Sequence, residues 1–232
     1  MRIVKDLTPF NHSKGRGGWD VDVIVIHVMQ GTMPGTRSWF HADRSDVSAT
    51  YGVPREGDEV VQYVEESDTH AANGIKVNPR AAIVLERPGV NPNKYSISIE
   101  HEGTGGQDLT DSQRTLSAWL IAGIIKRHPK VKLSDRHIIP HDRIRNDKAC
   151  PGAINMEKLL LAARIATQPA LPSVLTYPRV VWSDYFQRKT GDGWLVVTRY
   201  KSDTDWSFVP LKQITTKPTK AQTALSRMPP GP

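Results

Sequence analysis

The only cysteine of the 232-residue chain lies in a charged loop whose residue types could do chemistry. Cys150 follows His141 by nine residues and Lys148 by two, within the stretch IIPHDRIRNDKACPG. A lone cysteine is most often a small buried hydrophobic residue. Here its neighbours are polar on one side and turn-forming on the other, which does not fit a core strand. Two functional interpretations remain, a nucleophile activated by a histidine base and a metal ligand.

A second histidine extends the metal interpretation. His27 lies near the end of the most apolar run of the chain, VDVIVIHV, and His141 follows RHIIP. Side chains at strand ends converge from separate segments, and thiolate and imidazole suit zinc, which in catalytic sites keeps one position open for water. His27, His141 and Cys150 would form a tetrahedral set with one vacancy. From the residues alone, a zinc hydrolase and a cysteine hydrolase both remain open.

Strands must bring these residues together. The β-branched run over residues 21–28 is too short for a typical helix and predicts a buried central strand. Two strands are predicted around the turn signal Arg55–Asp58, one in YSISIEHEG ending near Glu100, and a short one in RHIIPH. Residues 1–20 are polar and glycine-rich and predict an irregular lead-in, and residues 67–94 are rich in loop signals.

Helices alternate with these strands. GTRSWFHAD predicts a short helix. Thr110 and Gln113 form a capping-box pattern before TLSAWLIAGIIKRH, whose apolar residues share one helical face, and Pro129 stops this helix. INMEKLLLAARIAT predicts a second amphipathic helix. The alternation over residues 21–167 predicts an α/β fold with a central mixed β-sheet flanked by helices.

Charge and composition narrow the class of partner. The formal net charge is +7 and the sequence pI is about 9.5, which favours a polyanionic partner: nucleic acid, an anionic membrane or an acidic wall polymer. The N-terminal MRIVKDLTPF lacks a signal-peptide pattern, and the longest apolar run, LSAWLIAGII, is too short to span a bilayer. We therefore expect synthesis in the cytoplasm without a signal peptide, and no membrane partner.

Six segments of the chain occur in the order found in one enzyme family. They are VIVIHVMQGT, VSATYGVPREGDEVVQYV, DTHAANG, YSISIEHEG, LTDSQRTLSAWLIAGIIKRH and IIPHDRIRNDKACPG. Over about residues 20–165 the chain resembles the zinc-dependent N-acetylmuramoyl-L-alanine amidases. That family includes phage lysozymes of the amidase type and is related to the peptidoglycan recognition proteins.

The resemblance implies a metal centre and two catalytic residues. The family's metal ligands fall on His27, His141 and Cys150, which would hold one Zn²⁺ per chain. The acidic residue that ends the SIxIE strand falls on Glu100, the expected general base. The lysine two residues before the last ligand falls on Lys148, which would stabilise the anionic intermediate.

The resemblance also implies substrate contacts and contains two departures. The histidine of the HAxN loop falls on His70, with Asn73 nearby, and both are expected to contact substrate. Where some members have a catalytic tyrosine this chain has Ala49, so Tyr51, two positions later, is not assigned to catalysis. Thr50 stands where other members have a histidine.

The implied activity is hydrolysis of peptidoglycan at the amide between N-acetylmuramic acid and L-alanine of the stem peptide. This is the activity of a phage endolysin, which reaches the wall after release and causes bacterial lysis, and we expect a monomer. Two alternatives stay open: a non-catalytic peptidoglycan-binding protein on the same fold, and a cysteine hydrolase using Cys150 and His141. Glu102 is a weaker candidate for the catalytic acid.

The composition changes after residue 167. Residues 1–167 are expected to form the zinc amidase domain, residues 168–175, with QPALP, a linker, and residues 176–232 a small, basic, tryptophan-rich β-module with a disordered end. From residue 172 onward there are nine Lys or Arg against four Asp or Glu. This excess accounts for most of the net positive charge of the chain.

Three tryptophans characterise this expected module. Trp182, Trp194 and Trp206 recur twelve residues apart with turn residues between them, which is typical of short antiparallel strands. Aromatic rings stack on sugars and basic side chains attract phosphate or carboxylate, so we expect binding to the cell wall or its anionic polymers. The tryptophans would also serve as the core of so small a module. Single-stranded nucleic acid is an alternative partner that we do not expect.

Overall fold

The computed structural model describes residues 1–168, 183–190, 193–201 and 206–214. The chain divides into two units, Met1–Pro169 and Ala170–Pro232, which we describe separately. Among the helices of the described residues, none combines the length and the apolar character needed to cross a lipid bilayer.

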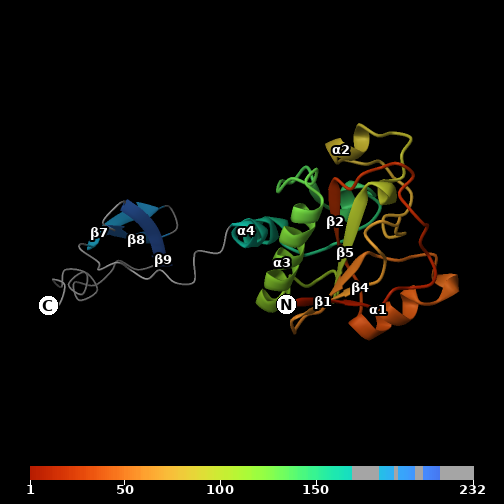
Figure 1. Ribbon diagram of the computed structural model, residues 1–232, viewed down its shortest axis with the longest axis horizontal. Coiled ribbons are helices and arrows are strands. Elements are labelled where there is room, and N and C mark those ends of the chain that lie inside the picture. The colour runs from red at the N-terminus through yellow and green to blue at the C-terminus, as the bar shows by residue number, and fades with distance from the viewer. Residues whose placement is uncertain (169–182, 191–192, 202–205, 215–232) are drawn as a thin grey trace. The chain divides into compact units, whose positions relative to one another are not determined.

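A six-stranded mixed sheet forms the centre of the first unit (Figure 1). Its strands are Arg2–Lys5 (β1), Val23–Val28 (β2), Tyr51–Val53 (β3), Glu59–Gln62 (β4), Ser96–His101 (β5) and Ile138–Pro140 (β6). They lie in the order β1-β4-β3-β5-β2-β6. Only β3 and β4 pair antiparallel among these neighbours, across the predicted turn, and the other pairs are parallel. The predicted mixed sheet is confirmed.

Helices cover both faces of this sheet. They are Met33–Phe40 (α1), Ala82–Leu85 (α2), Asp111–Arg127 (α3) and Met156–Thr167 (α4), with short 3-10 turns at Asp43–Ser45 (η1), Pro92–Lys94 (η2) and His141–Arg143 (η3). In Figure 1, α3 and α4 lie together on one side of the sheet, and α1 and α2 lie apart from this pair. The α/β fold with flanking helices predicted from the sequence is therefore confirmed.

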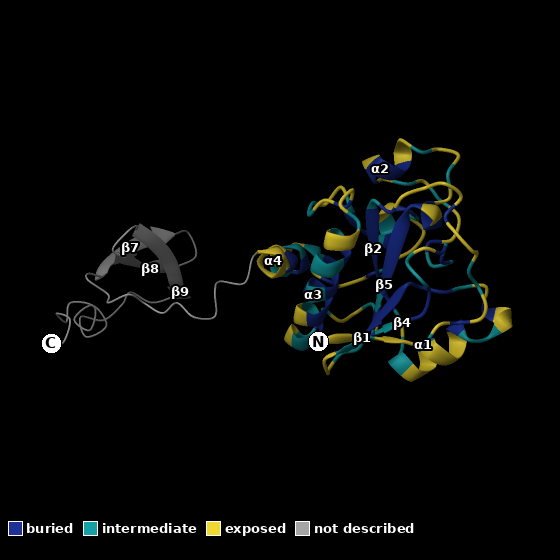
Figure 2. Cartoon of the chain, viewed as in Figure 1, coloured by how far each residue is buried: buried dark blue, intermediate teal, exposed yellow. Residues whose placement is uncertain are grey.

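Strand β2 is buried on both faces, as the run of β-branched residues predicts. All six of its residues are buried, and Figure 2 shows it as part of the buried centre. Ile24 and Ile26 belong to the core cluster that includes α3 and α4, whereas Val23 and Val25 pack on the opposite face with Val84 of α2. Since side chains alternate along a strand, His27 lies on the face of Val23 and Val25.

Helix α3 begins where the capping pattern predicts. The Thr110 hydroxyl accepts a hydrogen bond from the Gln113 backbone N–H at 3.0 Å. The Gln113 side chain does not complete the reciprocal capping box, because its Oε1 accepts no hydrogen bond from the described residues. Its Nε2 donates instead to the backbone carbonyls of Val53 at 3.1 Å and Glu102 at 3.0 Å. It thereby ties the start of α3 to the ends of β3 and β5. The helix ends at Arg127, before Pro129.

The expected irregular lead-in over residues 1–20 is wrong at its start. Residues Arg2–Lys5 form β1, which pairs in parallel with β4 in the register Ile3↔Val60. This strand is short, mostly exposed and lies at the edge of the sheet, so its four residues carry too little apolar pattern to stand out from a loop. It is held by backbone pairing to β4.

The second unit contains three described strands. Ser183–Thr190 (β7), Gly193–Lys201 (β8) and Trp206–Ile214 (β9) pair antiparallel in the order β7-β8-β9. Trp194 lies in β8 and Trp206 in β9. Trp182, the tail beyond residue 214 and all but Gln168 of the expected linker lie outside the described residues. The function expected of this unit stays a prediction.

Candidate active site

Parallel pairing brings two of the predicted site residues to one edge of the sheet. Strands β2, β5 and β6 run parallel, so their carboxyl ends meet at the same edge. The register places His27 beside Glu100 and Ile26 beside Pro140. His141 directly follows Pro140. His27 Nδ1 also lies 3.8 Å from Glu100 Oε1.

The loop after η3 returns the cysteine to this edge. The Asp142 N–H donates to the Cys150 carbonyl at 2.8 Å, which closes the loop. The Cys150 Sγ lies 3.8 Å from His27 Nδ1 and accepts the Val28 N–H at 3.4 Å. One ligand atom from each of His27, His141 and Cys150 lies within 4.8 Å of the others. Two imidazoles and a thiolate at this spacing match the donor set that zinc prefers.

Both histidines are in the neutral form that metal binding requires. Burial holds the pKa of His27 well below its ordinary value, and the neighbouring His141 lowers it further. Burial also lowers the pKa of His141, with further lowering by the charges of Arg145 and Lys148. Behind the centre, His27 Nε2 lies 3.2 Å from Asn73 Oδ1 and His141 Nε2 lies 3.1 Å from the Asn73 carbonyl.

The thiol is half-buried and protonated when no cation is beside it. Burial, together with the nearby charge of Glu100, raises the pKa of Cys150 to about 12. An activated cysteine nucleophile needs a lowered pKa, so this environment does not favour the cysteine-hydrolase interpretation. A metal ligand has no such requirement in the free protein, because the cation itself displaces the thiol proton on binding.

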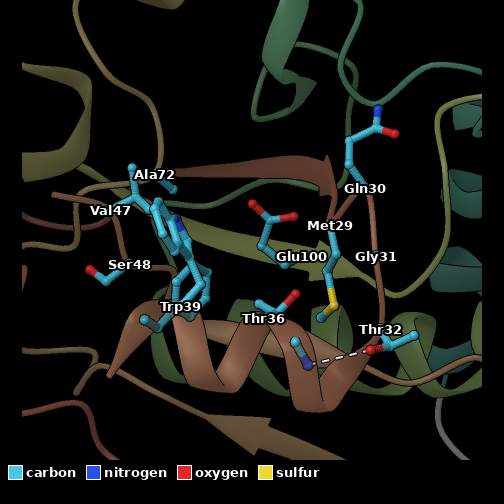
Figure 3. Close-up of a pocket in the computed structure, with 12 residues that line it drawn as sticks. Met29, Gln30, Gly31, Thr32, Thr36, Trp39, Val47, Ser48, Ala72 and Glu100 are labelled. Carbon is cyan, nitrogen blue, oxygen red and sulfur yellow. Dashed lines mark hydrogen bonds between the residues drawn. The ribbon is translucent and has the colours of Figure 1, made fainter. Parts of the chain in front are cut away.

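Glu100 carries a mostly buried carboxyl group beside the metal-binding set. Burial raises the pKa of Glu100 to about 8. Its Oε2 has no hydrogen-bond partner among the described residues. Figure 3 shows the side chain projecting toward a cavity of about 400 Å³. Once ionised, a carboxylate that lies beside the metal-binding set and lines the cavity can accept a proton from a bound molecule.

Helix α1 forms one wall of this cavity. Thr36 and the half-exposed Trp39 of α1 line it opposite Met29, next to Glu100 (Figure 3). The start of α1 is held by Glu102, whose Oε1 accepts the Met33 N–H at 3.0 Å and whose Oε2 accepts the Arg55 N–H at 2.9 Å. Glu102 therefore supports the cavity wall, a role that its sequence position does not reveal.

The remaining predicted residues occupy different positions. Lys148 is exposed, and its charge acts on both His141 and Cys150. His70 and Asn73 are buried, and both contact Ser96 through hydrogen bonds. Their expected contact with substrate stays a prediction. The Tyr51 hydroxyl donates to Glu66 at 2.8 Å, which agrees with leaving Tyr51 out of the catalytic set.

Two residues of the site gave no signal in the sequence. Trp39 lies in a short amphipathic segment, where an aromatic residue equally predicts core packing. Ser96 begins the predicted strand β5, and serine in a strand is usually a neutral filler. The role of Ser96 depends on which face of the sheet it occupies, and this follows from strand register, which the sequence leaves open. The role of Trp39 depends on how helix α1 packs.

Comparison with known proteins supports the fold. Several solved structures share the fold. A selenomethionine derivative of AmpD is 21% identical with a TM-score of 0.55, covering 72% of this chain and 94% of that one. The catalytic domain of XlyA is 17% identical with a TM-score of 0.53, covering 70% and 99%. The N-acetylmuramoyl-L-alanine amidase LysC from Clostridium intestinale is 16% identical with a TM-score of 0.51, covering 72% and 98%.

Sequence comparison identifies the family itself. No curated protein matches the chain in sequence. The family model described as N-acetylmuramoyl-L-alanine amidase (Amidase_2) matches residues 17–153, which is more than half of the chain. The matched range contains both histidines, the cysteine and Glu100. The chain belongs to the N-acetylmuramoyl-L-alanine amidase family, and its activity is that of a peptidoglycan amidase.

Proposed function

We propose that this protein is a zinc-dependent hydrolase of the amide bond between N-acetylmuramic acid and L-alanine in the peptidoglycan stem peptide. The observation that carries the proposal is the clustering of His27, His141 and Cys150 within 4.8 Å, beside Glu100 and its cavity. Membership of the amidase family supports the class of bond. The spacing and chemistry of the three side chains support the metal.

His27, His141 and Cys150 would hold one Zn²⁺ per chain. A bound zinc ion acts as a Lewis acid and brings the pKa of a coordinated water to about 7. Three protein ligands are the usual number in catalytic zinc sites, where the fourth position stays open. Two neutral imidazoles and one thiolate give the bound centre a net charge of about +1, which favours an electron-rich carbonyl beside it.

The protein's own residues would carry the protons and the charge. Glu100, whose Oε1 lies 3.8 Å from His27 Nδ1, would take a proton from the attacking water and pass it to the departing nitrogen of L-alanine. Lys148 would stabilise the negative charge that develops on the carbonyl oxygen. Removing one such preorganised donor typically costs about 3 kcal/mol of transition-state stabilisation.

The cavity next to Glu100 would receive the substrate. Its wall combines Trp39 with the hydroxyls of Thr36 and Ser48, a mixture that suits a sugar ring carrying a lactyl group. Figure 3 shows Glu100 between Trp39 and Met29 among the residues that line the cavity. The scissile amide would then lie between the aromatic wall and the metal-binding set.

Glu100→Gln separates chemistry from metal binding. We expect this variant to retain stoichiometric zinc and to lose the release of new L-alanine amino groups from purified cell wall. Chelation of the wild-type protein should abolish release, and added Zn²⁺ should restore it. Activity that survives chelation but disappears on thiol alkylation would support the cysteine hydrolase, and wall binding without any release would support the non-catalytic alternative.

The second unit would bind anionic polymers of the cell wall. Support comes from its sequence, with nine basic against four acidic residues from residue 172 onward and three regularly spaced tryptophans. Removal of residues 172–232 should weaken binding to whole walls and leave the release of amino groups from soluble fragments intact. If the full-length protein binds DNA and the truncated protein does not, this result would support the nucleic-acid alternative.

A lytic role follows from these two activities. An amidase made in the cytoplasm and delivered to the wall would act as an endolysin, and the excess positive charge would concentrate it on an acidic wall. Addition of the purified protein to chloroform-treated bacteria should reduce turbidity, and Glu100→Gln should not. Retention of full wall cleavage without a fall in turbidity would favour a role in wall turnover.

A further inference from the structure

Asn73 contacts both histidines of the metal-binding set. Its side-chain Oδ1 lies 3.2 Å from His27 Nε2, and its backbone carbonyl oxygen lies 3.1 Å from His141 Nε2. Asn73 is fully buried, and its backbone N–H donates to Asn93 Oδ1 at 3.0 Å. One residue, fixed at its backbone and at its side chain, therefore lies behind two ligands that come from different elements, His27 of β2 and His141 of η3.

The direction of the hydrogen bonds around Asn73 is set by its neighbour Ser96. The Ser96 hydroxyl donates its single proton to the Pro92 carbonyl at 2.8 Å. It must then accept from Asn73 Nδ2, which lies 2.9 Å away. This contact turns the Asn73 amide so that its oxygen, which can only accept, faces His27. The proton of the neutral His27 ring is consequently on Nε2.

The same argument holds for His141, whose partner is the backbone carbonyl of Asn73 and not its side chain. A backbone carbonyl has no proton to donate, so His141 must donate from Nε2 to Asn73. In both neutral rings the lone pair is then on Nδ1. His27 Nδ1 is the atom that faces Cys150 Sγ at 3.8 Å. The two carbonyls of Asn73 thus select the ring nitrogen that is available to a cation.

His70 supports this arrangement through its contact with Ser96, the residue that orients the Asn73 amide. Its Nδ1 accepts the Ala72 N–H at 3.2 Å, so its proton is on Nε2, which lies 3.1 Å from the Ser96 carbonyl and 3.2 Å from the Ser96 hydroxyl. His70 is also buried, at 1% exposure. Both residues of the HAxN loop therefore contact Ser96, and Asn73 alone also contacts the metal-binding set.

We propose that Asn73 is a positioning residue that holds both histidines in the tautomer with a free Nδ1, so that the metal centre is preorganised before the cation arrives. This inference rests on the proposed zinc site. Partners behind metal-binding histidines commonly fix ring orientation and raise ligand basicity, and their loss typically costs 10- to 100-fold in metal affinity. Here one asparagine would serve two ligands, one through its side chain and one through its main chain.

The tautomers can be measured without metal, by residue-specific ¹⁵N chemical shifts of the histidine rings in the metal-free protein near neutral pH. We expect both His27 and His141 to carry the proton on Nε2. Asn73→Ala should disturb only His27, because the variant keeps the backbone carbonyl that binds His141. Asn73→Asp keeps an acceptor oxygen and should retain the His27 tautomer. A proton on Nδ1 of either ring in the wild-type protein would overturn the proposal, even if no variant folds.

Zinc affinity gives the second readout. Competition with a chromophoric chelator should show Zn²⁺ bound about 10- to 100-fold more weakly by Asn73→Ala. Thr8→Val is the matched control, since it removes a different buried hydrogen bond, from the Thr8 hydroxyl to the Phe40 carbonyl at 2.6 Å, and should leave the affinity within twofold. Unchanged affinity in Asn73→Ala would contradict the positioning role. Failure of the wild-type protein to bind zinc would instead refute the proposed function. The tautomer measurement would still test the role of Asn73, because it is made on the metal-free protein.

Discussion

Gly152 packs so closely against Gly105 that a Cβ atom on Gly152 would overlap the Gly105 carbonyl group. The neighbouring Ala153 N–H donates to the same carbonyl oxygen at 2.8 Å. Gly152 also has a φ of +68°, a conformation that side chains other than glycine rarely adopt. This contact fixes the loop that carries Cys150 against the loop after β5, two residues from the thiol.

Gly152→Ala should therefore weaken metal binding. The added methyl group cannot fit without moving the backbone, and the displaced loop would carry Cys150 away from His27. We expect at least a tenfold loss in zinc affinity, measured by chelator competition. Gly15→Ala is the control, because Gly15 has a similar φ of +70° but no atom within 4 Å of the Cβ position. Equal zinc affinity in the two variants would show that the close contact does not hold the metal-binding loop.

Glu66 is expected to make folding stability depend on acid pH. Burial alone would raise its pKa, but hydrogen bonds from His128, Arg127 and Tyr51, and the charge of Arg127, lower it from 4.5 to about 2. The difference corresponds to about 3 kcal/mol of stability at neutral pH. Because the folded-state pKa is depressed, this stability is present above about pH 4.5 and is lost as the pH falls toward 2.

Urea unfolding between pH 7 and pH 2, followed by circular dichroism, tests this expectation. Glu66→Gln should be less stable than the wild type at pH 7, and the difference should shrink below pH 4.5. Glu59→Gln removes a carboxylate from an exposed pair with Arg2 and should change stability little at any pH. A constant difference between Glu66→Gln and the wild type across the whole range would be inconsistent with the depressed pKa.

Trp39 should contribute to substrate binding and not to metal binding. Its indole is 49% exposed at the cavity wall, and loss of aromatic packing typically costs about 0.5–1.5 kcal/mol. Trp39→Ala should raise KM for soluble peptidoglycan fragments about two- to tenfold and leave the zinc content unchanged. Trp19→Ala provides the comparison, because Trp19 is similarly exposed but packs near Tyr95, away from the residues lining the cavity. Equal KM values for both variants would exclude the proposed role.

Strong local patterns made much of the fold predictable. The β-branched run over residues 21–28 predicted a buried strand, and the pattern from Thr110 to Pro129 identified α3, whose Leu116 and Ile124 are buried as expected. Strand β1 was missed because its residues are held by pairing to β4, a long-range contact that leaves little trace in four residues. Local periodicity therefore predicted those elements whose apolar face is large.

The candidate site was predictable to the extent that residue type determines its chemistry. A cysteine and two histidines at segment ends left a zinc site and a cysteine nucleophile both open, and the resemblance to the amidases implied the metal. The structure brings these three side chains together. The role of Asn73 was not accessible, because it depends on the direction of hydrogen bonds set by Ser96. The constraint on Gly152 likewise arises from Gly105, which is distant in sequence.

The metal content of the purified protein tests the central claim most directly. Elemental analysis of the wild-type protein and of Cys150→Ser, prepared identically, should find one zinc per chain in the wild type and a large loss in the variant, because the hydroxyl does not replace a thiolate ligand. Circular dichroism should confirm that the variant is folded. Stoichiometric zinc in folded Cys150→Ser, or no zinc in an active wild-type protein, would contradict the account.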